Sequence, residues 1–148
     1  MTEPQPFLGV ISDMDGVITR TATVHQQAWR EMFDGFLQAR SEREGEDLSP
    51  FTDADYREHL DGKPRLDGVR DFLAARGIEL PEGEPDDEPE QDTVRGLGAR
   101  KNRMFLDVLE REGVEVFADA IRAFDRWQLG GLPVAAISAG RRSLMTTP

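Results

Sequence analysis

The sequence contains no cysteine, which excludes a disulfide framework and a zinc site with thiolate ligands. Positive charge is also scarce, with 18 Lys and Arg against 29 Asp and Glu and a formal net charge of -11 at pH 7. Nucleic acids and anionic membranes attract positive potential, so this balance argues against either as the main partner. A local site for an anionic substrate remains compatible with it.

Long apolar runs are absent too, since none approaches the roughly 20 residues that cross a bilayer. The first ten residues lack the basic and apolar regions of a signal peptide. We therefore expect a cytoplasmic protein.

The 148 residues, 38% of them hydrophobic, suit one domain or a small domain with an insertion. Two short apolar segments, 7–12 and 132–138, are typical of strands buried on both faces of a parallel sheet. Helical patterns lie between them, at 23–40, 51–60, 66–76, 99–112 and 118–129, and polar loops are expected at 41–50 and 82–92. The sequence thus predicts an α/β sheet interrupted by a helical insertion.

Two aspartates, Asp13 and Asp15, follow the first predicted strand. Strand residues two apart point the same way, so both carboxylates would project at the carboxyl end of the strand, where α/β sheets bind ligands. Gly16 allows a sharp turn beside them. A turn with two solvated aspartates is the plain alternative, and the D-x-D spacing alone leaves both interpretations open.

The longer string "SDMDGVITRTATVHQQAW" resembles the first motif of the haloacid dehalogenase (HAD) superfamily, in particular its β-phosphoglucomutase-like branch. "HLDGKPRLDGVRDFLAARGI" and "GLGARKNRMFLDVL" resemble parts of the helical cap of that branch, and "VAAIS" resembles the strand of its second motif. The resemblance implies a HAD-like (Rossmann-like) parallel-sheet core with a helical cap inserted after the first strand. It divides the chain into a first core segment at 1–19, a cap at 20–100 and a return to the core at 101–148.

The resemblance also implies roles in the core. Asp13 would be the nucleophile that forms an aspartyl-phosphate, and Asp15 the general acid and then base. Mg²⁺ would be held by Asp13 and Asp15, the latter through its backbone carbonyl. Ser138, Ala139 and Gly16 would bind the phosphate.

In the cap, the resemblance implies substrate contacts from His25, Gly62, Arg65, Lys101 and Asn102. Arg65 would grip the distal phosphate of the substrate as a bidentate donor. His25 would couple substrate binding to closure, and Lys101 and Asn102 would face the sugar. For each of these side chains, an ordinary surface position is the alternative.

The function implied is Mg²⁺-dependent phosphoryl transfer on a sugar phosphate, by mutase or phosphatase chemistry. The family's third-motif lysine and fourth-motif acidic pair lie beyond the second motif, and this chain has ten residues after Ser138. The run "SAGRRSLMTTP" also departs from the second motif at Gly140 and Arg142. We therefore expect a truncated or frame-shifted product, or a fragment, that is inactive alone. The alternative function is that of a non-catalytic fragment or pseudoenzyme.

Overall fold

The computed structural model describes residues 7–45 and 48–138. The chain divides into two compact units. Residues 1–22 and 114–148 form the first, here called the sheet unit, and residues 23–113 form the second, the helical unit.

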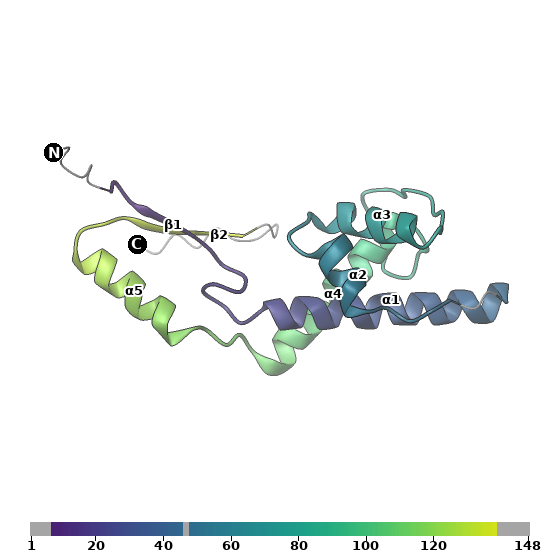
Figure 1. The fold of residues 1–148 in the computed structure, drawn as a ribbon, viewed down its shortest axis with the longest axis horizontal. Coiled ribbons are helices and arrows are strands. Elements are labelled where there is room, and N and C mark those ends of the chain that lie inside the picture. Colours follow the sequence, from purple (N-terminus) through teal and green to yellow (C-terminus); the bar gives the residue numbers. More distant parts are fainter. Residues whose placement is uncertain (1–6, 46–47, 139–148) are drawn as a thin grey trace. The chain divides into compact units, whose positions relative to one another are not determined.

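The sheet unit is built on two parallel strands within the described residues (Figure 1). Strand β1 (Val10–Asp13) pairs with β2 (Val134–Ile137), with Val10 opposite Val134 and Asp13 opposite Ile137. Helix α5 (Ala118–Leu129) precedes β2 and contacts it. The parallel pairing brings the carboxyl ends of both strands to one edge of the sheet.

The expectation of strands buried on both faces is wrong. Exposure alternates along β1 and β2, and Ile11 and Ile137 are 73% and 56% exposed. Period-two alternation is what a sheet covered on one face produces. Burial on both faces requires packing elements on each side, which the described residues do not provide.

The helical unit contains α1 (Ala22–Glu44), which starts one residue before the unit, and α4 (Val94–Glu112). Between them lie the short helix α2 (Asp53–Asp55), the π-helical turn η1 (Tyr56–Leu60) and α3 (Arg65–Ala75). None of the helices in the described part of the chain is long and apolar enough to cross a membrane.

Helix ends follow local sequence signals closely. Thr52 caps α2 by accepting a hydrogen bond from the Asp55 N–H at 3.2 Å, as expected of an N-cap threonine. Gly77 has φ +64° and ends α3, with the Ile78 N–H bonded to the Leu73 carbonyl at 2.9 Å. Thr93 caps α4, which therefore begins five residues before the predicted start at 99.

The predicted loop at 41–50 is wrong for its first four residues, which belong to α1. Arg40 and Glu44 form an ion pair at 2.7 Å with the i,i+4 spacing that supports a helix. The helix ends only at Gly45, whose φ is +71°. The acidic segment 82–92 is free of helix and strand, as predicted.

Aromatic rings form the centre of the helical unit. Phe33 of α1 lies 4.0 Å from Phe72 of α3 and 5.5 Å from Phe51, measured between ring centroids. Trp29 stacks on Phe33 at 5.5 Å and is 5% exposed. The core extends through Met32, Phe36, Leu37, Leu60, Val69, Leu73, Ile78, Val94 and Leu97. This packing holds together α1, α3 and α4, the helices that carry most of the predicted cap residues.

Candidate active site

Both motif aspartates lie at the carboxyl edge of the sheet. Asp13 is the last residue of β1, and its exposed carboxylate accepts a hydrogen bond from the Met14 N–H at 2.8 Å. Asp15 follows in the turn and is half-buried. The strand therefore delivers one solvent-facing carboxylate and one shielded carboxylate to the same edge.

Two hydroxyl groups hold the Asp15 carboxylate. Ser138 Oγ donates to its Oδ2 at 3.1 Å, and Thr21 Oγ1 donates to its Oδ1. Ser138 follows β2 and is 123 positions away in sequence, so the parallel pairing of the strands brings these two predicted site residues together. Asp15 is thus held by one residue from each of the two chain segments that form the sheet unit.

Thr21 is a site residue that the sequence reasoning missed. It is 5% exposed, and its hydroxyl lies 2.9 Å from the hydroxyl of Thr19, which in turn donates to the Met14 carbonyl at 3.1 Å. The alternating threonines in "TRT" after the aspartates were the available signal, because residues two apart share one side of an extended segment.

Gly16 shapes the turn after β1. Its φ is +77°, a conformation that side chains rarely adopt, and its N–H bonds to the Thr19 carbonyl at 2.8 Å. The Met14 carbonyl accepts from the N–H groups of Ile18 and Thr19, both at 2.9 Å. A phosphate-binding role for Gly16 stays a prediction, and Ala139 lies outside the described residues.

The residues at this edge fit Mg²⁺ by their donor chemistry. Mg²⁺ takes oxygen ligands and is usually bound through one or two carboxylates together with waters and substrate phosphates. The exposed carboxylate of Asp13 suits such a ligand, whereas both oxygens of Asp15 accept hydroxyl hydrogen bonds. Within residues 7–45 and 48–138, no three His, Asp or Glu side chains gather as a metal-binding group. An ion here would therefore depend on water and substrate for most of its ligands.

In the helical unit, His25 and Lys101 meet across α1 and α4. Lys101 Nζ lies 2.7 Å from His25 Nδ1, and because an ammonium has no lone pair, the ring nitrogen is the acceptor. The His25 ring stacks on Phe105 with 4.0 Å between centroids, and Lys101 Nζ lies 4.7 Å from the centre of the Phe105 ring and 5.2 Å from that of Trp29. Lys101 is only 5% exposed. The pair is a partly buried contact between helices, in which the ammonium also lies over two aromatic rings as in cation–π interactions.

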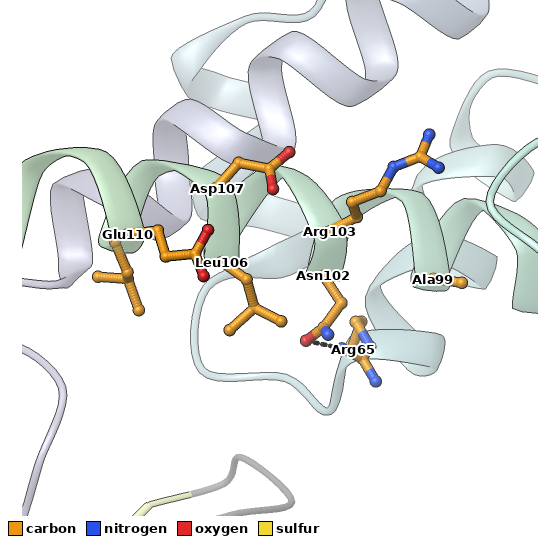
Figure 2. A pocket seen from close by; sticks show the side chains of 8 residues that line it. Arg65, Ala99, Asn102, Arg103, Leu106, Asp107 and Glu110 are labelled. Carbon is orange, nitrogen blue, oxygen red and sulfur yellow. Dashed lines mark hydrogen bonds between the residues drawn. The ribbon is translucent and has the colours of Figure 1, made fainter.

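Arg65 and Asn102 meet at a different place. Arg65 Nη1, at the start of α3, donates to Asn102 Oδ1 on α4 at 2.6 Å. Both line an open hollow of about 740 Å³, in which Leu106 and Glu110 continue the same side of α4 (Figure 2). The other lining residues are Ala99, Arg103, Asp107 and Leu109.

Charges around the hollow are partly neutralised. Arg103 donates to Glu90 at 2.6 Å, and this hydrogen bond holds the pKa of Glu90 below its usual range. Glu90 belongs to the acidic segment 82–92, which is also fastened by the bond from Arg100 Nε to the Pro89 carbonyl at 2.6 Å. Arg103 is thus paired with a carboxylate of this segment, whereas Arg65 donates to the side-chain amide of Asn102.

Glycine brings Arg65 close to α4. A Cβ atom at Gly98 would lie 2.7 Å from Leu66 Cδ2 and 3.8 Å from Arg65 Nε, so no larger residue fits without movement. Gly62 lies in the exposed turn before α3 with φ +70°. The structure therefore separates the cap residues of the sequence prediction into two sets, the His25–Lys101 contact and the Arg65–Asn102 hollow.

A parallel sheet with two carboxylates at its carboxyl edge and a helical unit inserted in the sequence between its strands defines a two-unit α/β protein. Residues 7–147 match the family model of the haloacid dehalogenase-like hydrolases. The chain belongs to this family, which confirms the resemblance seen in the sequence.

Individual relatives agree with this assignment. The chain is 44% identical over 147 residues to a beta-phosphoglucomutase of Mycobacterium bovis, covering 97% of this chain and 56% of that protein. The archaeal beta-phosphoglucomutase of Pyrococcus sp. strain ST 04 has the same fold, with a TM-score of 0.60 at 23% identity over 91% of this chain and 54% of that one. CbbY of Rhodobacter sphaeroides in complex with phosphate gives a TM-score of 0.57 at 18% identity, over 88% and 50% of the two chains. The chain therefore spans about half the length of each of these three relatives, and the predicted HAD-like fold is confirmed.

Proposed function

We propose that this chain takes part in Mg²⁺-dependent phosphoryl transfer on a sugar phosphate, with the sheet unit as catalytic core and the helical unit as substrate-binding cap. The observation that carries the proposal is the pairing of an exposed Asp13 with an Asp15 held by Ser138 and Thr21 at one sheet edge. The 44% identity to a beta-phosphoglucomutase supports the substrate class.

Asp13 is the nucleophile in this proposal. One of its carboxylate oxygens attacks phosphorus, the bond from phosphorus to the sugar oxygen breaks, and an aspartyl-phosphate forms. Its exposure at the end of β1 leaves an oxygen accessible to the incoming phosphate. Mg²⁺ bound at this carboxylate supplies positive charge that offsets the repulsion between the two anions.

Asp15 carries the protons. As a carboxylic acid it gives its proton to the departing sugar oxygen, and as a carboxylate it then takes a proton from the water or sugar hydroxyl that attacks the aspartyl-phosphate. The attack restores the free Asp13 carboxylate. The hydroxyls of Thr21 and Ser138 orient Asp15 for this exchange.

Arg65 and Asn102 bind the part of the substrate that does not react. A guanidinium pairs with a second phosphate through parallel hydrogen bonds, and the amide of Asn102 offers both a donor and an acceptor to sugar hydroxyls. Their hollow of about 740 Å³ is large enough for a hexose phosphate.

The test compares turnover of glucose phosphates with Mg²⁺ by the chain alone and by the chain joined to the segment of the M. bovis relative that it does not match. Asp13→Asn should lower turnover at least about a thousandfold, because an amide forms no acyl phosphate. The matched control is Asp119→Asn, an exposed aspartate of α5 paired with Arg122. It should retain wild-type activity, and circular dichroism should show both variants folded.

Activity that survives Asp13→Asn would remove this residue from the mechanism. The alternative, a non-catalytic fragment or pseudoenzyme, predicts no turnover by the chain alone, and a pseudoenzyme also lacks turnover in the joined form. Turnover by the chain alone that disappears in Asp13→Asn but persists in Asp119→Asn would exclude both.

A further inference from the structure

The loop that leads to Arg65 has an unusual local geometry. It consists of residues 61–64 and follows η1, where the Asp61 N–H bonds to the Tyr56 carbonyl, five residues back, at 2.9 Å. Such π-helical turns are rare and occur frequently at functional sites. Gly62 adds a positive φ of +70°. Side-chain contacts with α3 hold the loop in this conformation.

Asp71 of α3 contacts side chains from both the loop and the π-helical turn. Its carboxylate accepts a hydrogen bond from the Lys63 ammonium, and His59 Nδ1 lies 3.4 Å from Asp71 Oδ2. Lys63 Nζ also donates to the Glu58 carbonyl of η1 at 3.1 Å, and helix ends leave such carbonyls without an intrahelical partner. The hydrogen bond from Lys63 is the main reason that the pKa of Asp71 lies below its usual range.

An apolar contact presses the same turn against the same face of α3. Leu60 is 4% exposed, and a Cβ at Gly68 would lie 2.8 Å from Leu60 Cδ2. Gly68 and Asp71 are three residues apart and share one face of the helix. Close packing at Gly68 and polar contacts at Asp71 therefore act together on η1 and the loop.

We propose that Asp71 is a positioning residue for Arg65: by holding Lys63 and His59, its carboxylate fixes residues 61–64 and with them the start of α3. The proposal rests on the proposed function, because it takes Arg65 as the phosphate ligand. The Lys63 and Asp71 side chains are 36% and 46% exposed, so the effect is bounded by the strength of a solvent-exposed ion pair. Loss of the carboxylate should weaken sugar phosphate binding by about three- to fivefold.

The experiment measures the Kd of glucose 6-phosphate for the ¹⁵N-labelled 148-residue chain from the amide shifts of Gly62, Arg65 and Asn102. Asp71→Ala should raise Kd about three- to fivefold and lower the heteronuclear NOE of the Gly62 amide, which reports increased loop motion. Lys63→Met should have a similar effect, and the double variant should be no weaker than either single one.

Asp67→Ala is the matched control, since it removes one carboxylate from the same helix. Its partner is Arg70 at 2.6 Å, and neither residue belongs to the loop. It should leave Kd and the Gly62 signal unchanged. If Asp71→Ala behaves like this control, or if its effect adds in full to that of Lys63→Met, the positioning role is wrong.

Arg65→Ala separates this inference from the proposed function. It should abolish the saturable shifts in the hollow, while leaving the Gly62 amide as ordered as in the wild type. If Arg65→Ala binds glucose 6-phosphate as tightly as the wild type, the phosphate-binding role of Arg65 fails. If Arg65→Ala loses binding but Asp71→Ala does not weaken it, only the role of Asp71 fails.

Discussion

Removing the Asp55 carboxylate should cause a large loss of stability in the helical unit, although only one polar group is removed. Asp55 Oδ2 accepts hydrogen bonds from the Thr52 N–H at 2.8 Å, the Thr52 hydroxyl at 2.7 Å and Arg76 Nη2 at 2.7 Å. The Asp55 and Arg76 side chains are only 15% and 18% exposed. Losing a helix cap costs about 1 kcal/mol and losing a hydrogen bond to a charged group about 1.5–3 kcal/mol. Arg76 keeps its bonds to the Ser49 and Pro50 carbonyls, so we expect Asp55→Ala to cost about 2–4 kcal/mol.

Urea unfolding followed by Trp29 fluorescence measures this loss, because Trp29 is buried in the core of the helical unit. Trp127→Phe removes the signal of the sheet unit. Asp53→Ala is the matched control, since its pair with Arg30 is 60% and 42% exposed, and should stay within about 1 kcal/mol of the wild type. Equal free energies of unfolding for the two alanine variants would refute the reasoning.

The same carboxylate should make stability depend on pH in a defined direction. Burial raises the pKa of Asp55, but the hydrogen bonds from Arg76 and Thr52 outweigh it and hold the pKa below the usual 3.8. A carboxylate with a lowered folded-state pKa stabilises the protein above its unfolded-state pKa and loses this effect as pH falls through the folded-state value. The difference between wild type and Asp55→Ala should therefore be constant from about pH 7 to 5 and shrink below about pH 4. A difference that grows on acidification would contradict this.

The remaining predictions concern catalysis and helix packing. Asp15→Asn should slow turnover of a sugar phosphate by about 10²–10⁴, and slow p-nitrophenyl phosphate less because its leaving group needs no proton; equal losses in the phosphorylation step would count against the acid role. Gly98→Ala should lower the melting temperature and weaken glucose 6-phosphate binding, because its Cβ would meet Leu66 at 2.7 Å. Gly35→Ala on α1, with open space around it, should instead stabilise by about 0.5–1 kcal/mol, and a similar effect of both alanines would disprove the packing argument.

Local signals predict some helix ends, because they act over a few residues, but the end of α1 and the start of α4 were predicted wrongly. The threonine cap of α2 and the glycine stop of α3 satisfy backbone groups within one turn, so a pattern of a few residues is enough to suggest them. α4 begins five residues before the predicted start, and the added turn contains Gly96 and Gly98, although glycine is a poor helix former. The Cβ position of Gly98 is blocked by Leu66 of α3, a tertiary contact, whereas that of Gly96 is blocked by the backbone of Gln91, five residues earlier in the chain.

The sheet edge was predictable in part. Parallel strands place Asp13, Asp15 and Ser138 at one edge, and this follows from topology once both strands are identified. The bond from Thr21 to Asp15 depends on how the turn at Gly16 folds back, which no spacing rule describes. The prediction of strand burial was wrong because an apolar run shows only that a strand can be buried. Whether it is buried depends on the elements that pack against it.

Lys101 and Asn102 are adjacent in the sequence and belong to the same cap motif, but their side chains lie at different places in the helical unit. Successive helix residues point about 100° apart, so the two side chains of α4 leave the helix in different directions. Lys101 turns to His25 and two aromatic rings, where its charge is buried, whereas Asn102 turns to Arg65 at the open hollow. A substitution at Lys101 therefore alters the packing of α1 on α4 together with any effect on substrate. A substitution at Asn102 acts on the hollow first, which makes it the cleaner probe of sugar binding.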